Sequence, residues 1–95
     1  MQIERDASKE TSNRNKHGFG FALAEIVFSN PLTTIVYDRF ENGEHRWHAI
    51  GHVGNHVIVV VHTYPDPENE ERVRVIGLRK ATKAERARYE NQRFD

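Results

Sequence analysis

Histidines are the first residues of this sequence that could do chemistry, because imidazole is the commonest protein ligand for zinc, copper or nickel. Five of the six lie close together in the chain: His45, His48, His52, His56 and His62. In an extended strand, residues three apart point to opposite faces, so His45 and His48 diverge. His52 and His56 lie on either side of an exposed turn. We therefore predict no metal site, and histidines that face solvent or pair with neighbours.

Arginines are the more informative set, because a guanidinium group is planar, always charged and matched to phosphate oxygens. Arg46 and Arg74 occur within segments that otherwise favour strands. Arg79 comes where a strand gives way to a helix, and we expect its side chain to be exposed and to add little to stability. Two interpretations stay open. The arginines form a phosphate-binding surface, or they lie on a solvated sheet face and pair across strands with Glu44 or Glu70.

Charge is balanced in total but unevenly distributed along the chain. Fourteen basic residues match fourteen acidic ones, yet residues 38–71 hold two basic and seven acidic side chains. Residues 72–95 hold eight basic and three acidic side chains, a net charge of +5. A basic segment of this kind suits an RNA or DNA partner. The residues that we expect to contact RNA there are Arg72, Lys80, Lys83, Arg86 and Arg88.

Some further candidates have an ordinary structural explanation. Lys16 and His17 end a predicted helix, where basic residues complement the helix dipole without any other role. Tyr89 lies on the predicted C-terminal helix and is read most simply as an aromatic at the edge of the core. Trp47 follows Arg46, so we expect it in the core on the opposite face of its strand.

Composition excludes several classes of protein. With 95 residues, the chain is expected to form a single domain over residues 1–95, and 37% hydrophobic residues allow only a thin core. The longest apolar run, Val57–Val61, is far too short to cross a membrane. The N-terminal residues do not look like an export signal, so we expect a cytoplasmic protein. The absence of cysteine excludes disulfides, thiolate zinc sites and iron–sulfur clusters, and we expect no cofactor.

The pattern of apolar residues predicts an α+β fold. A short strand at 3–5 precedes a helix capped by Asp6 and ended by Gly18, and a core helix with the stripe Phe21, Ala24, Val27 and Phe28 follows. The remaining strands are predicted at 33–37, 46–53, 57–63 and 72–76, with turns at 41–44 and 53–56. A capping box over residues 82–85 opens a C-terminal helix through about residue 89. We predict an antiparallel meander of four to five strands, packed against two N-terminal helices.

Several short motifs, taken in order, resemble one family. They are Asn15-Lys16-His17-Gly18, Asn30-Pro31, Arg46 with Ala49-Ile50-Gly51, Val59–Thr63, Arg72–Ile76, and Leu78–Thr82 with Glu85-Arg86 and Tyr89. Over about residues 3–90 this arrangement is similar to that of the BrnT toxins. The resemblance implies a RelE-like fold and a ribonuclease toxin of a type II toxin–antitoxin system that inhibits translation. It also implies a cognate BrnA-like antitoxin with a ribbon-helix-helix part. This antitoxin would mask the toxin in a hetero-oligomer, and the complex would bind DNA only through the antitoxin.

By motif position, the resemblance carries the family's active surface to six residues: Lys16, His17, Arg46, Arg74, Arg79 and Tyr89. In a metal-independent ribonuclease the 2′-hydroxyl of RNA attacks the phosphate and leaves a 2′,3′-cyclic phosphate. The three arginines would bind the phosphate, and His17 or Lys16 would exchange protons. Tyr89 would serve as another acid or as a stacking surface for a base.

Two departures from the family pattern keep alternatives open. Tyr64-Pro65 and a longer acidic loop stand where the family usually has Glu-Arg and a short glycine turn, so one family arginine is missing. Gly77-Leu78 replaces the small polar residue usual before Arg79. The alternatives are a non-catalytic nucleic-acid-binding module, and a decayed toxin that acts only with its antitoxin in operon regulation.

Overall fold

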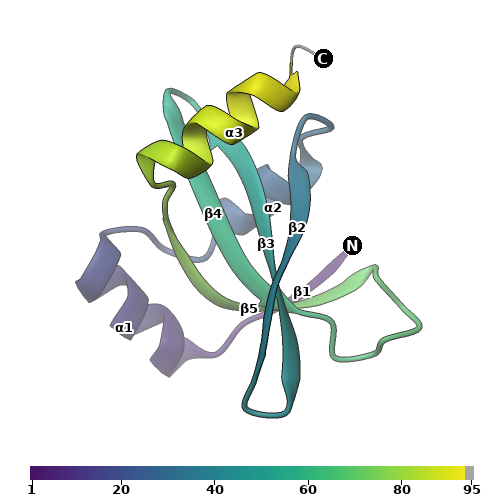
Figure 1. The fold of residues 1–95 in the computed structure, drawn as a ribbon. Coiled ribbons are helices and arrows are strands. Elements are labelled where there is room, and N and C mark those ends of the chain that lie inside the picture. The colour runs from purple at the N-terminus through teal and green to yellow at the C-terminus, as the bar shows by residue number, and fades with distance from the viewer. Residues whose placement is uncertain (94–95) are drawn as a thin grey trace.

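The computed structural model describes residues 1–93, which form a five-stranded sheet and three helices (Figure 1). The predicted α+β class is confirmed. The elements in chain order are β1 (Gln2–Glu4), α1 (Ala7–His17), α2 (Leu23–Ser29), β2 (Thr34–Glu41), β3 (Glu44–Val53), β4 (His56–Thr63), β5 (Arg72–Lys80) and α3 (Lys83–Arg93).

The sheet has the order β1-β5-β4-β3-β2. Strands β2 to β5 form the predicted antiparallel meander. The prediction of a purely antiparallel sheet is wrong, because β1 pairs with β5 in parallel, with Gln2 opposite Arg72 and Glu4 opposite Arg74. The meander leaves the outer edge of β5 without a partner strand, and β1 pairs with the start of that edge. The chain then passes through α1 and α2 before it enters β2 at the other edge of the sheet.

Both tight turns have the conformation that their residues favour. Asn42 and Gly43 both have positive φ, at 53° and 78°, as a type I′ hairpin turn requires. Gly54 has a φ of 59° and begins the second hairpin turn, as predicted. The strands run further than the apolar pattern indicates: β2 extends to Glu41 past a bulge between Tyr37 and Arg39, because β3 offers backbone partners along that length.

The first helix has the predicted ends. Asp6 caps it by accepting a hydrogen bond from the Lys9 backbone N–H at 3.0 Å, and Gly18 ends it with a left-handed φ of 82°. Asn13 on this helix donates to the Leu78 carbonyl at 2.7 Å and accepts from the Leu78 N–H at 3.0 Å. The Asn13 side-chain amide thus forms the hydrogen bonds that a further strand would otherwise form with this part of the β5 edge, beyond the end of β1.

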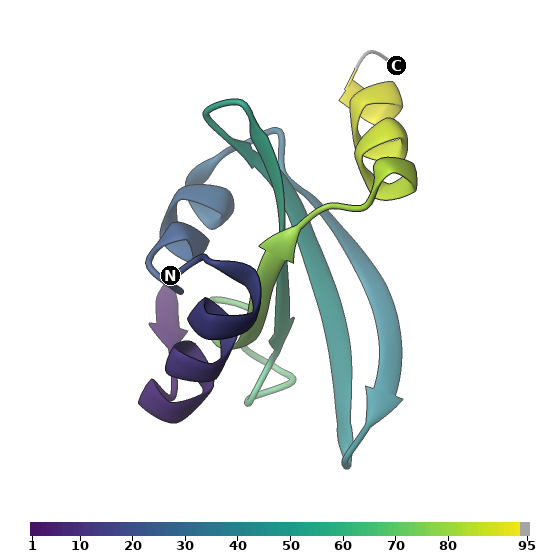
Figure 2. The same ribbon diagram turned by 90° about the vertical axis from the view of Figure 1, so that its left-hand side faces the viewer.

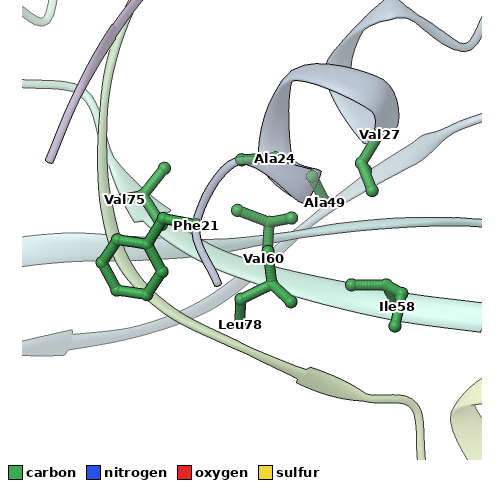
Figure 3. Packing of buried hydrophobic residues seen from close by; sticks show 8 residues of the cluster. All are labelled: Phe21, Ala24, Val27, Ala49, Ile58, Val60, Val75 and Leu78. Carbon is green, nitrogen blue, oxygen red and sulfur yellow. The ribbon is translucent and has the colours of Figure 1, made fainter. Parts of the chain in front are cut away.

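The helices lie on both sides of the sheet. α1 and α2 lie on one side and α3 on the other (Figure 2). The main core packs Phe21 and Val27 against Ala49, Val60 and Leu78, as Figure 3 shows for the whole cluster. No helix within residues 1–93 is long and apolar enough to cross a membrane.

Candidate functional site

The candidate site lies on the α3 side of the sheet. Alternation along β3 places Arg46 and His48 on the same face as Ile50, which packs against Tyr89 of α3. We call the polar part of this face the arginine face; it comprises Arg46, His48, Thr63, Arg74 and Arg79. The sheet therefore brings together three of the six predicted catalytic residues on one surface.

Arg79 is bound to the first turn of α3. Its Nη1 and Nη2 atoms donate to the two carboxylate oxygens of Glu85 at 2.7 and 3.1 Å. These bonds, together with the Thr82 backbone N–H, lower the pKa of Glu85 to about 2, and they raise the pKa of Arg79. The Arg79 side chain is 27% exposed, so it is not the exposed arginine that we expected at a strand exit.

His48 is the residue that the sequence analysis missed. Its Nε2 lies 3.4 Å from Asp38 of β2, and its Nδ1 lies 3.9 Å from Glu85 of α3. It is two residues from Arg46 and therefore on the same face, a signal that was available in the sequence. An imidazole among arginines can exchange protons, which a guanidinium group cannot do at neutral pH.

Arg46 and Thr63 are neighbours across β3 and β4, since the next pair along the ladder is Trp47 with His62. Arg46 donates through Nη1 to Glu41 at 3.0 Å. Its Nε atom and the Thr63 hydroxyl are buried and have no hydrogen-bond partner among the described residues. A buried donor without an acceptor costs about 1–3 kcal/mol. Two such groups side by side indicate a place suited to an oxyanion.

Arg74 completes the row across the sheet. It lies opposite Thr63 in the β4–β5 register. Its guanidinium contacts Glu4 at 3.6 Å and Glu44 at 3.7 Å. The cross-strand pairing with Glu44 that we considered for the arginines is therefore present. Each arginine of the arginine face has a carboxylate partner, and an incoming phosphate must compete with these carboxylates.

Lys16 and His17 lie elsewhere on the molecule. Both are exposed at the end of α1, where they line a shallow hollow with Ile76 and Asn13. Within residues 1–93, no hydrogen bond or ion pair joins them to the arginine face. The structure therefore groups the predicted arginines with His48, and it leaves Lys16 and His17 apart from them.

Tyr89 is a core residue of the α3 side. Its ring is 1% exposed and packs with Ile50, Val57 and Val59. Its hydroxyl is 2.9 Å from Nδ1 of His52. A base can stack only on an exposed ring, so in this conformation Tyr89 has a structural position, as the core-edge interpretation predicted.

The predicted RNA-contacting residues are spread over several surfaces. Arg72 forms an ion pair with Glu4 at 2.6 Å beside Arg74. Lys80 pairs with Ile58, whose side chain belongs to the core on the other side of the sheet. The remaining residues are exposed on α3: Lys83, Arg86 and Arg88.

The remaining histidines form local contacts. His62 is fully buried, its Nδ1 lies 3.1 Å from the Val60 carbonyl, and burial lowers its pKa to about 4. His45 lies 2.9 Å from the Tyr37 hydroxyl. No group of three or more histidine or carboxylate side chains within residues 1–93 is arranged to hold a metal ion.

Arginines, a hydroxyl and an imidazole on one sheet face are groups that a small RNA-cleaving protein needs. Among known families, the model described as "Ribonuclease toxin, BrnT, of type II toxin-antitoxin system" matches residues 6–85. The chain therefore belongs to the BrnT family of ribonuclease toxins, as its motifs indicated. No curated protein matches the chain in sequence. Membership of a type II system implies an antitoxin partner.

Proposed function

We propose that this chain is a metal-independent endoribonuclease that inhibits translation and is neutralised by a BrnA-like ribbon-helix-helix antitoxin. The arginine face is its active surface. The observation that carries this proposal is the row Arg46, Thr63 and Arg74, in which Arg46 Nε and the Thr63 hydroxyl are buried and have no hydrogen-bond partner within residues 1–93. The family description supports ribonuclease activity in general.

The chemistry follows from what the arginine face can supply. The RNA 2′-hydroxyl attacks the adjacent phosphorus, the 5′-oxygen leaves, and a 2′,3′-cyclic phosphate remains. Arg46, Arg74 and Arg79 stabilise the charge that develops on the equatorial phosphate oxygens. His48 is our candidate for proton exchange, because it lies between Asp38 and Glu85 on the same face. Lys16 and His17 remain the candidates that the family resemblance implies.

Binding of RNA must release Arg46 and Arg74 from their carboxylates. Glu41 accepts from Arg46, and Glu44 and Glu4 contact Arg74. Partly exposed ion pairs of this kind contribute about 0–1 kcal/mol each, so a phosphate can replace them at small cost. The Arg79–Glu85 pair is bidentate and less exposed, so we expect it to stay in place.

The same pairing favours a second candidate function. If the carboxylates are not displaced, the chain is a decayed toxin that binds its antitoxin and takes part only in operon regulation. The missing family arginine at Tyr64-Pro65 agrees with that alternative. Binding of RNA without cleavage would identify it.

Three variants test the arginine face. Arg46→Ala should lower RNA cleavage about a hundredfold, as the loss of one transition-state donor does in other enzymes. Thr63→Val removes the buried hydroxyl and keeps the side-chain shape, so it should lower cleavage at least about tenfold while the free energy of unfolding stays constant or rises. Arg14→Ala, on the exposed side of α1, is the matched control and should cleave as the wild type does.

The Thr63→Val result distinguishes most sharply between a Thr63 hydroxyl that acts on the substrate and one that only supports the fold. Lower cleavage with unchanged stability supports a hydroxyl that acts on the substrate. Unchanged cleavage, or a loss of cleavage that merely follows a loss of stability, would contradict the assignment of this row.

A further inference from the structure

A cavity borders the arginine face, shares Thr63 and Arg74 with it, and carries a different chemistry. It has a volume of about 600 Å³ and lies between the β2–β3 hairpin and the loop that joins β4 to β5. Figure 1 shows the hairpin tip and this loop at the end of the molecule away from α3. Three aromatic rings line the cavity. Trp47 contacts the Tyr37 ring at a centroid distance of 5.1 Å and the Tyr64 ring at 5.8 Å.

Trp47 is therefore not the core residue that the sequence predicted. It does lie on the face opposite Arg46, as expected. On that face α2 packs against Gly51 through Val27 and against His62 through Phe28, and Trp47 packs instead on Tyr37 and Tyr64. The tryptophan is left half-buried beside the cavity.

The charges at this cavity are mainly negative. Glu44 and Glu70 line it, and the lining arginine, Arg74, is already in contact with Glu44 and Glu4. Burial first, and then the charge of Glu70, raise the pKa of the Tyr64 phenol. The cavity also lies in the acidic part of the chain, residues 38–71, with two basic and seven acidic side chains. The carboxylates of such a surface attract a cation, which aromatic rings also attract.

An exposed apolar strip continues from the cavity along β2. This strand is the outer strand of the sheet, so one of its edges has no partner strand. Ile35 is 45% exposed, Tyr37 48% and Phe40 61%. The ring centroids of Phe40 and His45 are 4.9 Å apart, and His45 lines the cavity beside Tyr37. An open edge with exposed apolar side chains favours a protein segment as the occupant.

We propose that a segment of the antitoxin lies along β2 and inserts an arginine or lysine side chain into the aromatic cavity between Glu44 and Glu70. The apolar stem of that side chain would pack on Trp47 and Tyr64, and its charge would lie among the carboxylates. The inference uses the antitoxin partner that the family implies. It does not require that the chain cleaves RNA, although the cavity shares Thr63 and Arg74 with the proposed active surface.

Trp47 is the one tryptophan of the chain, so its fluorescence reports on this cavity directly. The probes are N-acetyl-arginine amide, its neutral citrulline analogue, and adenosine and cytidine monophosphates. We expect the arginine amide to change the Trp47 emission and to bind at least about fivefold more tightly than the citrulline analogue, because the charge supplies the difference. A response to the nucleotides but not to the arginine amide would assign the cavity to RNA and overturn the proposal, as would no response to any probe.

Glu70 and Glu68 provide a matched pair of variants in the same exposed loop. Glu70 lines the cavity, whereas Glu68 does not. Glu70→Gln should weaken binding of both the arginine amide and a BrnA-like antitoxin at least about fivefold, and Glu68→Gln should leave both close to wild type. Equal effects of the two substitutions would mean that only the overall negative charge of the loop matters, and would contradict a specific site.

RNA cleavage by the free wild-type chain is measured separately. A chain that cleaves RNA but shows no difference between Glu70→Gln and Glu68→Gln refutes the docking site alone. A chain that shows this difference and does not cleave refutes the ribonuclease proposal alone.

Discussion

Replacing Glu85 by glutamine tests the contact that joins α3 to the arginine face. A glutamine can still accept the Thr82 N–H of the capping box, so the substitution removes mainly the charge that Arg79 binds. The pKa of Glu85 is about 2 against an ordinary 4.5, because of the Arg79 hydrogen bonds first and those from Thr82 in addition. At about 1.4 kcal/mol per pKa unit this shift corresponds to roughly 3 kcal/mol. Since the side chain is 20% exposed and water screens the pair, we expect a loss of about 1–2 kcal/mol at pH 7.

The pH dependence of this loss distinguishes charge from packing. A carboxylate whose pKa is lowered in the folded state stabilises the fold above pH 4.5, and the contribution is lost as the pH falls toward 2. Urea unfolding of wild type and Glu85→Gln should therefore differ at pH 7, and the difference should shrink below pH 4.5 and vanish only near pH 2. Glu90→Gln is the control, because the pair of Glu90 with Arg86 is more exposed and should contribute about 0.5 kcal/mol or less. A difference for Glu85→Gln that is equal at both pH values would refute the reasoning.

Three further results are expected. Asn13→Ala should lower the free energy of unfolding, measured in urea, by about 2–4 kcal/mol, because the buried Leu78 N–H and carbonyl lose their partner. Asn15→Ala, on the exposed side of α1, should change this free energy little. His62 should titrate by NMR with a pKa of about 4. The free energy of unfolding should fall as the pH drops from 6.5 to 4, because in this range only the unfolded chain takes up the proton. An NMR titration midpoint near pH 6.5 would contradict the burial of His62. His48→Ala should slow RNA cleavage at least about tenfold, and a larger effect of His17→Ala would instead favour the end of α1 as the source of the proton-transferring group.

Local signals in the sequence predicted the helix ends and turns well, because they depend on residues that are close in the chain. Asp6 and Gly18 fix the ends of α1 through a side-chain cap and a left-handed backbone. Asn42-Gly43 fixes the hairpin that sets the register of β2 and β3. The parallel pairing of β1 with β5 joins residues about seventy positions apart, and no local pattern indicates it.

The candidate site could be predicted in part for the same reason. The alternation of strand residues groups Arg46 with His48, and this grouping was available from the sequence although His48 was overlooked. The capping box was visible in the sequence, but the second role of Glu85 was not, because its pair with Arg79 depends on how the end of β5 lies against the first turn of α3. The aromatic cavity at Trp47 depends on how far α2 covers the sheet, which only the folded structure shows.

The most direct test of the central claim is to incubate the purified, antitoxin-free protein with end-labelled single-stranded RNA in EDTA and to identify the fragment ends. We predict cleavage that survives the chelator, fragments with 2′,3′-cyclic phosphate ends, and cleavage about a hundredfold slower in Arg46→Ala but not in Arg14→Ala. Cleavage that EDTA abolishes, or fragments that carry 3′-hydroxyl ends, would contradict a metal-independent mechanism on the arginine face.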